Sequence, residues 1–316
     1  MSKNMNFPFF NKKGKIKKGE SGNRALQTRG QKIYHVFNTI ILIVLGLVCL
    51  LPFWHIISVS FSDKAPVIAG QVKLWPVRFT WSAYQYVLER SAFWRSLLIT
   101  FARVFLGVPL NLLLVILSAY PLSKQKEKFH MRSVYVWLFF FTMLFNGGLI
   151  PTYLLVTNLK MLNTIWALVL PGCLNVFNVI LMLNFFRQIP HELEDAAFVD
   201  GAGHWRILWQ IFLPISLPSI ATVTLFSLVG HWNSWFDGMI YMKKAEMYPL
   251  QTYLRSVIMT MNFEKMSPTE LERLAKLNDR SVKDAQIIIG AIPILIVYPF
   301  LQKYFVTGMT LGSVKG

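Results

Sequence analysis

The stretch FNTIILIVLGLVCLLPFWHII, residues Phe37–Ile57, contains no Asp, Glu, Lys or Arg. A helix rises about 1.5 Å per residue, so about 20 apolar residues cross the roughly 30 Å of hydrocarbon in a bilayer. Of the 316 residues in the chain, 54% are hydrophobic and 15% are charged, whereas about 25% of the residues in a soluble domain are charged. The apolar stretches lack the alternation that marks a transmembrane β-strand. The sequence therefore predicts an all-α membrane protein.

Six apolar stretches predict six transmembrane helices. Turn-forming residues interrupt the third stretch at 146–148, Asn-Gly-Gly, and the fourth at 171–172, Pro-Gly, which predicts bends at these places. The sixth stretch is the shortest and contains Pro293 and Pro299. The six stretches are 37–57, 97–120, 134–156, 165–186, 211–230 and 285–302.

Lys and Arg residues determine the predicted orientation, because cytoplasmic segments retain an excess of positive charge. Nine of them precede the first span, four lie in the short connection between the second and third spans, and five lie in the loop between the first two spans. The N-terminus is therefore predicted to be cytoplasmic, and with six spans the C-terminus is cytoplasmic too. Residues 1–36 are predicted to form a basic, disordered cytoplasmic tail, and residues 37–316 the transmembrane domain.

The formal net charge of +17 raises the question of nucleic-acid binding. Much of this charge lies in the tail and in loops next to the hydrocarbon, where anionic lipid headgroups are the expected partner. We therefore expect membrane lipid as a partner, and no nucleic acid.

The segment DAAFVDGAGHWRILWQIFLP, residues 195–214, is a polar interruption between the fourth and fifth spans. Pro190 suits the first turn of a helix, and the carboxylates of Glu192, Glu194 and Asp195 complement its positive N-terminal end. Gly201 suits the left-handed residue that ends a helix. Helical spacing places a leucine, two alanines and a carboxylate on one face that a partner can approach closely: Leu193, Ala196, Ala197 and Asp200.

A second helix is expected from about Gly203. Its predicted apolar face runs into the fifth span and consists of Trp205, Leu208, Trp209 and Phe212. From spacing alone, an amphipathic loop that lies on the membrane interface is an equally good interpretation of the whole segment.

Residues 195–214 resemble the coupling loop of ATP-binding-cassette importer permeases. Its motif consists of EAA, three residues, Gly, nine residues, Ile, one residue and Leu-Pro, and this chain keeps every spacing with Asp195, Ala196, Ala197, Gly201, Ile211, Leu213 and Pro214. Similarity to the carbohydrate branch, which includes the maltose importer, extends over residues 37–316. It rests on AAxxDGA around Asp200, on the prolines 214 and 218, on HWNSWF (231–236) and YPLQTYL (248–254), and on the ending YFVTGMTLGSVKG.

One residue departs from the motif, because its first position is normally glutamate. The resemblance implies that this carboxylate contacts a basic residue of the ATPase. Here the position is Asp195, preceded by Glu194, so either Asp195 makes the contact at closer approach or Glu194 supplies it. We favour Asp195.

The resemblance implies a type I importer permease fold, with a coupling loop at 187–213, in a multi-pass protein of the bacterial cell membrane. The chain has no GxxxxGK[ST] loop to bind ATP. It is therefore expected to be a transport subunit that is not an enzyme and binds no cofactor, with ATP and Mg on partner ATPases. The implied partners are a second permease subunit, two ATPase subunits and an extracytoplasmic sugar-binding protein.

Arg103 is the one charged residue in the second predicted span. It lies six residues from the outer end of that span, so it either snorkels to water, which we favour, or faces the transport pathway, where a cation would favour acidic sugars. Amides and an aromatic ring in or near the spans are further candidates for the pathway: Asn111, Asn146, Asn175, Asn178, Trp232 and Asn233.

The sequence gives weaker support to two other classes of protein. HELED (191–195) begins like the HExxH zinc motif, but Asp195 stands where the second histidine is required, so neither a metal site nor a catalytic residue is expected. A secondary transporter driven by an ion gradient suits broken spans but does not need a cytoplasmic coupling loop. The outer segment 237–284 is expected to form either a cap that contacts the binding protein or a surface helix near SPTELERLAKL.

Overall fold

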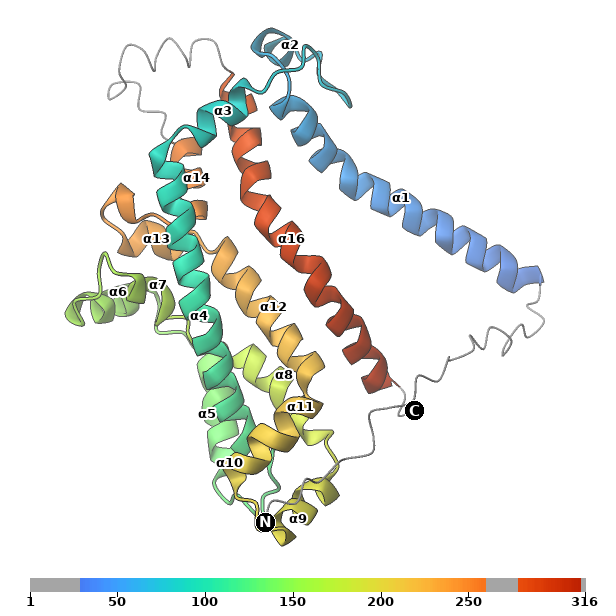
Figure 1. Cartoon of the computed structure of the whole chain (residues 1–316), viewed down its shortest axis with the longest axis vertical. Helices are drawn as coiled ribbons and strands as arrows, with labels where there is room; N and C mark the ends of the chain where they lie inside the picture. The colour runs from blue at the N-terminus through green and yellow to red at the C-terminus, as the bar shows by residue number, and fades with distance from the viewer. Residues whose placement is uncertain (1–28, 260–277, 314–316) are drawn as a thin grey trace, which may run out of the picture. The chain divides into compact units, whose positions relative to one another are not determined.

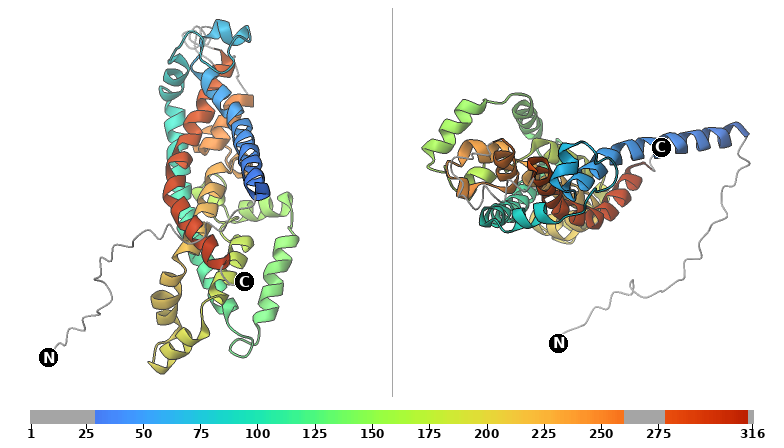
Figure 2. Two further views of the ribbon diagram at one scale, coloured as in Figure 1. Left: turned by 90° about the vertical axis from the view of Figure 1, so that its right-hand side faces the viewer. Right: turned by 90° about the horizontal axis from the view of Figure 1, so that it is seen from above.

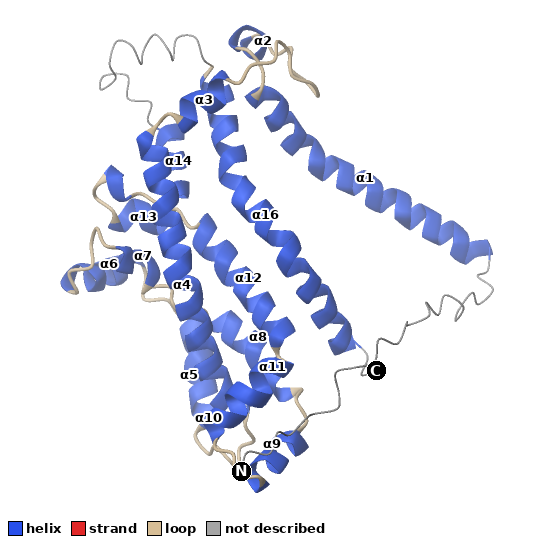
Figure 3. Ribbon diagram, in the orientation of Figure 1, coloured by secondary structure: helices blue, strands red, loops and turns tan. Residues whose placement is uncertain are grey.

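The computed structural model describes residues 29–259 and 278–313. Within them every regular element is a helix, and one isolated antiparallel β-bridge joins Ser62 and Phe79 (Figure 3). The prediction of an all-helical protein is confirmed for these residues. Residues 1–28 of the tail predicted at 1–36, and the sequence SPTELERLAKL of the outer segment, lie outside the described residues. Residues 29–36 of the predicted tail are helical, because α1 begins at Arg29, so the prediction of disorder is wrong for them.

Three long helices contain the first, second and sixth predicted spans: α1 (Arg29–Ser60), α4 (Ser91–Ser123) and α16 (Asp279–Ser313). Each has a stretch long and apolar enough to cross a membrane. Pro293 and Pro299 lie inside α16 without ending it.

Two further candidate spans are sharply bent pairs. Helices α5 (Arg132–Leu144) and α6 (Leu149–Asn158) meet at 107°, and Gly148 between them has a φ of +92°, which a residue with a Cβ rarely adopts. The bend predicted in the third span is therefore confirmed. Helix α12 (Leu217–Asn233) makes an angle of 82° with the helical segment His204–Ile215 that precedes it.

The fourth predicted span is divided between two short helices, α7 (Ile165–Val169) and α8 (Val176–Arg187). Helix α8 has 12 residues, which span about 18 Å. That is shorter than the roughly 30 Å of a bilayer core. By length and composition, the described residues contain three spanning helices, or up to five if each bent pair is one span. The number six stays a prediction.

Nine short elements complete the described chain. They are α2 (Lys64–Ile68), α3 (Ser82–Leu88), α9 (His191–Val199), α10 (His204–Ile207), the π-helix η1 (Leu208–Phe212), α11 (Leu213–Ile215), α13 (Phe236–Tyr241), the 3-10 helix η2 (Ala245–Met247) and α14 (Leu250–Met259).

The chain divides into two compact units, residues 1–53 and 54–316, and the described part of the first unit is the N-terminal part of α1. In the second unit, α4 packs against α8 and α12, and α12 packs in turn against α16 (Figures 1 and 2). The largest core cluster joins α4, α8, η1 and α12, and Val115, Met182, Phe186 and Val223 are among its buried residues.

Gly107 on α4 lies directly against the His231 side chain of α12. A Cβ atom at Gly107 would lie 2.6 Å from both Cε1 and Nε2 of His231 on α12. The His231 side chain is buried, so it has little room to move aside. The absence of a side chain at position 107 therefore sets the spacing of the two helices.

We predict that Gly107→Ala lowers the melting temperature of the detergent-solubilised protein, because overpacking a core costs about 1–3 kcal/mol. Gly230→Ala is the matched control, since a Cβ there meets nothing within 4 Å and alanine favours a helix. Equal melting temperatures for the two variants would contradict the packing argument.

Candidate functional site

The segment predicted to couple to an ATPase, residues 187–213, lies at the Ser123 end of α4 (Figure 1). Helix α9 begins directly after Pro190, with Glu192 and Glu194 in its first turn, and it ends at a left-handed Gly201 with a φ of +77°. The backbone N–H groups of Ala202 and Gly201 donate to the carbonyls of Ala197 and Phe198, at 2.9 and 3.0 Å. This is the Schellman arrangement. The helix predicted from the positions of proline, acids and glycine is therefore confirmed.

The two neighbouring carboxylates of α9 point in different directions. Glu194 is buried, with a side chain 2% exposed, and one of its oxygens lies 2.9 Å from Nζ of Lys124, the residue that follows α4. The Lys124 ammonium also lies over the rings of Tyr120 and Phe212, 3.8 and 4.2 Å from their centroids. Burial lowers the pKa of Lys124, and the interaction with Glu194 opposes that shift. The ion pair and the two rings together attach α9 to the end of α4.

Asp195 lies on the solvent side of the same helix, with 63% of its side chain exposed. It accepts a hydrogen bond of 2.9 Å from Nζ of Lys128, which is itself partly exposed. This hydrogen bond lowers the pKa of the Asp195 carboxyl and raises the pKa of Lys128. Of the two acids, Asp195 is therefore the one that a partner protein can reach in this structure.

The small residues of the motif lie at the surface or close to it. Ala196, Asp200 and Gly201 are exposed, and Ala197 is partly buried against the main core cluster. Leu193 and Val199 expose 44% and 88% of their area, so α9 presents apolar as well as small side chains to solvent. Ile211 and Leu213 pack against the same core cluster, and Pro214 lies in the first turn of α11.

The apolar face predicted for the second helix of this segment is wrong. Leu208 and Phe212 are buried, whereas Trp205 and Trp209 are 66% and 55% exposed. The prediction assumed one α-helix with 3.6 residues per turn, but Leu208–Phe212 forms a π-helix. The main core cluster covers Leu208 and Phe212 and leaves Trp205 and Trp209 uncovered.

The second part of the candidate site is a cavity of about 340 Å³ beside α4. Four of the predicted pathway residues lie around it: Arg103, Asn111, Asn175 and Asn178. The amide of Asn178 donates to Oδ1 of Asn111 at 3.3 Å, and Asn111 donates to the backbone carbonyl of Cys173 at 2.9 Å. Asn175 has a structural use as well, because its side chain caps the N-terminus of α8.

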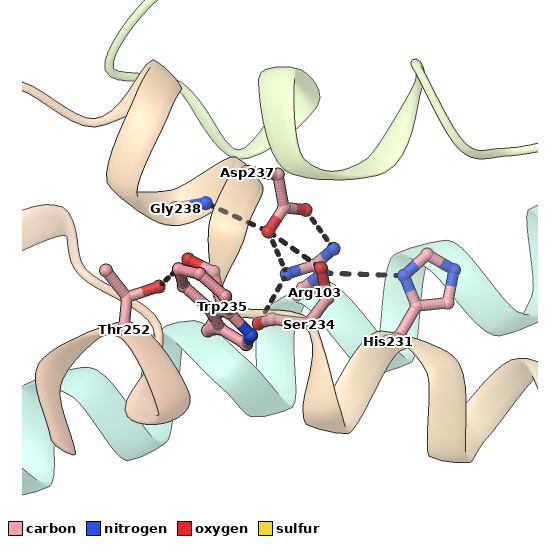
Figure 4. Close-up of polar contacts among 7 residues, drawn as sticks. All are labelled: Arg103, His231, Ser234, Trp235, Asp237, Gly238 and Thr252. Atoms are coloured by element: carbon pink, nitrogen blue, oxygen red, sulfur yellow. Dashed lines mark hydrogen bonds and ion pairs between the residues drawn. The ribbon is translucent and has the colours of Figure 1, made fainter. Parts of the chain in front are cut away.

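Arg103 does not snorkel to water, so that interpretation is wrong. It is 4% exposed, and it forms a two-point ion pair with Asp237 on α13, in which Nη1 donates to Oδ1 at 3.2 Å and Nη2 donates to Oδ2 (Figure 4). Nη1 also donates to the backbone carbonyl of Ser234 at 3.3 Å, and Nε donates to Nδ1 of His231 at 3.4 Å. A buried charge needs such compensation, and a nearby acid provides it more completely than distant water.

Asp237 is held in place by more than the arginine. Its Oδ1 accepts hydrogen bonds from the Ser234 hydroxyl at 2.8 Å and from the backbone N–H of Gly238 at 2.9 Å. Sequence reasoning missed Asp237, although an acid in the apolar surroundings of α12 and α13 was a visible signal that Arg103 had a counter-charge. Lys124 and Lys128 contribute to the charge bias that predicts orientation, but nothing local in the sequence marks them as partners of α9.

The three other predicted pathway residues lie elsewhere. Trp232 is buried and donates from its indole nitrogen to the carbonyl of Gly290 at 3.1 Å, so it joins α12 to α16. Asn146 accepts a hydrogen bond from the Gly148 N–H in the exposed turn between α5 and α6. Asn233 lines a different cavity, of about 490 Å³, near α14 and α16.

Several known proteins are similar to this chain over most of its length. The chain is 39% identical to Protein LplC of Bacillus subtilis (strain 168) over 92% of this chain and 97% of LplC. It is 38% identical to the polygalacturonan/rhamnogalacturonan transport system permease protein YtcP of the same organism, over 87% of this chain and 96% of YtcP. A crystal structure of a bacterial ABC transporter involved in the import of the acidic polysaccharide alginate contains a chain 35% identical to this one, with a TM-score of 0.80, covering 88% of this chain and 98% of that one.

Residues 80–311 match the family described as the binding-protein-dependent transport system inner membrane component. That range includes residues 187–213, the cavity and most of the described helices. The resemblance drawn from the motif at 195–214 is thereby confirmed. The chain belongs to this family and is a multi-pass transport component of the cell membrane rather than an enzyme.

Proposed function

We propose that this chain is a transmembrane subunit of an ATP-driven importer of sugars or oligosaccharides, and that α9 receives the force from its ATPase. The observation that carries this proposal is the attachment of α9 to α4. The helix presents a small-residue surface and an accessible carboxylate, while the buried pair Glu194–Lys124 joins it to a helix long enough to cross the membrane. Relatives whose names refer to polygalacturonan, rhamnogalacturonan and alginate support a saccharide as the cargo.

In this proposal Asp195 contacts a basic residue of the ATPase, and Glu194 has an internal role. Asp195 already binds Lys128 through a hydrogen bond, so an arginine or lysine of the ATPase would share or replace a contact that solvent can reach. Glu194 cannot exchange its partner without leaving Lys124 buried and unpaired, which is costly. The residues of the coupling contact are therefore Asp195, Ala196, Ala197, Asp200 and Gly201, with Ile211, Leu213 and Pro214 as their support.

The mechanism follows from this division of roles. Two ATPase subunits close on ATP and Mg, and α9 moves with them as a rigid body. The buried ion pair passes the displacement to α4, which lines the cavity that contains Arg103. Differences in contact between the two states supply the free energy of coupling. A second permease subunit and an extracytoplasmic sugar-binding protein complete the assembly.

The proposed topology has six spans, and both termini are cytoplasmic. The transmembrane domain comprises residues 37–316, the coupling segment 187–213 faces the cytoplasm, and the segment 237–284 faces outward. Residues 1–36 form a cytoplasmic tail.

Cysteine labelling tests this topology. In a background in which Cys49 and Cys173 are replaced by alanine, Val199→Cys should react with a membrane-impermeant maleimide in inside-out vesicles only. Gln71→Cys is the matched control, an exposed position between the first two spans that should react in right-side-out vesicles only. Labelling of Val199→Cys from outside would overturn the proposed role of α9.

Variants of the two carboxylates should separate their roles. Glu194→Ala leaves Lys124 buried and unpaired, so assembly should fail or the melting temperature should fall, at a cost of about 3–5 kcal/mol. An apolar pair, Lys124→Met with Glu194→Leu, should restore assembly.

Asp195→Ala should leave the melting temperature unchanged, because solvent already reaches that carboxylate, but it should raise the amount of ATP hydrolysed per sugar imported. If the Asp195→Ala complex hydrolyses the same amount of ATP per sugar imported as the wild type, Asp195 is not the contact with the ATPase.

Reconstitution tests the function itself. The chain alone in liposomes should not transport saccharide. The chain together with its partner permease, ATPase subunits and binding protein should import saccharide only when ATP is present inside. Transport by the isolated chain, driven by an ion gradient without ATP, would show that it is a secondary transporter.

A further inference from the structure

A cavity of about 340 Å³, separate from the two described above, lies between the C-terminal turns of α4, the loop that follows them, and α10 with η1 (Figure 1). Its volume is at the lower end of the roughly 300–1,000 Å³ that small-molecule sites occupy. Much of its lining is apolar or aromatic and includes Leu117, Phe129, Trp205 and Leu208. A ligand that fits this lining therefore has an apolar part.

The same cavity is lined by basic side chains and, among the described residues, by no acidic one. Lys128 and His204 both line it and are exposed to solvent, so an anion can reach them. Both also lie close to the ring of Phe198, with the Lys128 ammonium 5.6 Å and the His204 ring 5.1 Å from its centroid. Lys124 is buried and paired with Glu194, so it adds positive potential rather than a contact.

The helical segment His204–Ile215 places one wall of the cavity at the membrane surface. It meets α12 at 82°, and α12 is part of a candidate span, so the segment runs close to the plane of the membrane. Trp205 and Trp209 are exposed on this segment, and the exposed Arg206 lies between them in sequence. Tryptophan is enriched at the boundary between hydrocarbon and headgroups. The cavity therefore lies at the level of the lipid headgroups.

An anionic phospholipid fits this combination better than a free anion does. Its phosphate can accept hydrogen bonds from Lys128 and His204, and its acyl chain can cover the apolar wall, which inorganic phosphate would leave in contact with water. Lys128 has the capacity for this contact, because an ammonium has three hydrogens and Asp195 accepts only one of them. Basic pockets between transmembrane helices on the cytoplasmic side are typical sites for anionic headgroups.

We propose that this cavity binds an anionic phospholipid of the cytoplasmic leaflet. Lys128 and His204 bind the phosphate of its headgroup, Phe129 and Trp205 cover the first part of one acyl chain, and the rest of the lipid stays in the bilayer. The choice of leaflet rests on the proposed function and its topology, which place this end of α4 in the cytoplasm. The lipid contacts the segment that joins α9 to α12, so it is part of the surroundings of the proposed coupling helix.

Photocrosslinking of the full-length chain in lipid nanodiscs tests this site without an ATPase or a sugar. The probes are phosphatidylglycerol and phosphatidylcholine with identical acyl chains, each with a diazirine near the glycerol end of one chain and each at a small mole fraction in phosphatidylcholine. Peptide mass spectrometry locates the crosslinks. The measured quantity is the ratio of labelling by the phosphatidylglycerol probe to labelling by the phosphatidylcholine probe.

In the wild type, this ratio at Phe129 and Trp205 should exceed by at least about fivefold the ratio at Phe105, an exposed residue of α4 away from the cavity. Lys128→Gln removes a charge that binds the phosphate, so the ratio at the cavity should fall about fivefold. That factor corresponds to the roughly 1 kcal/mol that one basic residue contributes near an anionic membrane surface. Lys126→Gln is the matched control, because Lys126 is exposed and does not line the cavity. It should keep the wild-type ratio.

A second pair of variants tests the apolar part of the site. Leu117→Trp fills the cavity, so labelling of Phe129 and Trp205 by the phosphatidylglycerol probe should fall severalfold while labelling of Phe105 stays the same. Leu113→Trp is the matched control, because Leu113 lies one turn earlier on α4, is exposed and does not line the cavity. It should keep the wild-type labelling.

Three results would each overturn the inference. Equal ratios at the cavity and at Phe105 would show ordinary bilayer lipid, and an unchanged ratio in Lys128→Gln would show that this residue does not select the headgroup. Displacement of the phosphatidylglycerol probe by an excess of inorganic phosphate would show a site for a free anion. All three would leave the proposed function standing, because only the reconstituted complex with ATP and saccharide tests that function.

Discussion

A charge removed from water inside a helical bundle must be compensated, and two buried ion pairs among the described residues meet this constraint. Lys124 with Glu194 and Arg103 with Asp237 are both pairs in which each partner comes from a different part of the chain. Because breaking such a pair leaves an unpaired buried charge, each pair holds its two elements in one arrangement. One pair attaches α9 to α4, and the other attaches α13 to α4. Helix α4 is thus the element that connects the two parts of the candidate site.

The sequence alone predicts those parts of the structure that neighbouring residues decide. Helices α1, α4 and α16 follow from continuous apolar stretches, the bend before α6 follows from Asn-Gly-Gly, and the end of α9 follows from Gly201. The family could also be identified from the sequence, because the motif at 195–214 combines several residue types at fixed spacing. The asparagines around the cavity could be proposed because polar side chains are rare in apolar spans.

Sequence reasoning failed where distant contacts decide the outcome. The position of Arg103 near the end of a span favoured an exit to water, and only the fold shows that Asp237 lies beside it. Glu194 and Asp195 are adjacent in sequence and both acidic, yet the helix turns one toward Lys124 and the other toward solvent. Trp232 looked like a sugar-binding ring, but its indole nitrogen is used to join α12 to α16. The partners in each of these contacts are far apart in the sequence, and no short sequence pattern predicts that they meet.

The π-helix η1 has a consequence for how the segment before α12 tolerates a change of length. A π-turn holds one residue more than an α-turn, so it takes up one extra residue while the helical segments on either side keep nearly the same direction. Removal of one residue from Leu208–Phe212 would therefore restore α-helical winding with little effect on the direction of α9, whereas the same deletion in a regular α-helix rotates what precedes it by about 100°. A change of one residue between Gly201 and Ile211 is thus tolerated best inside η1.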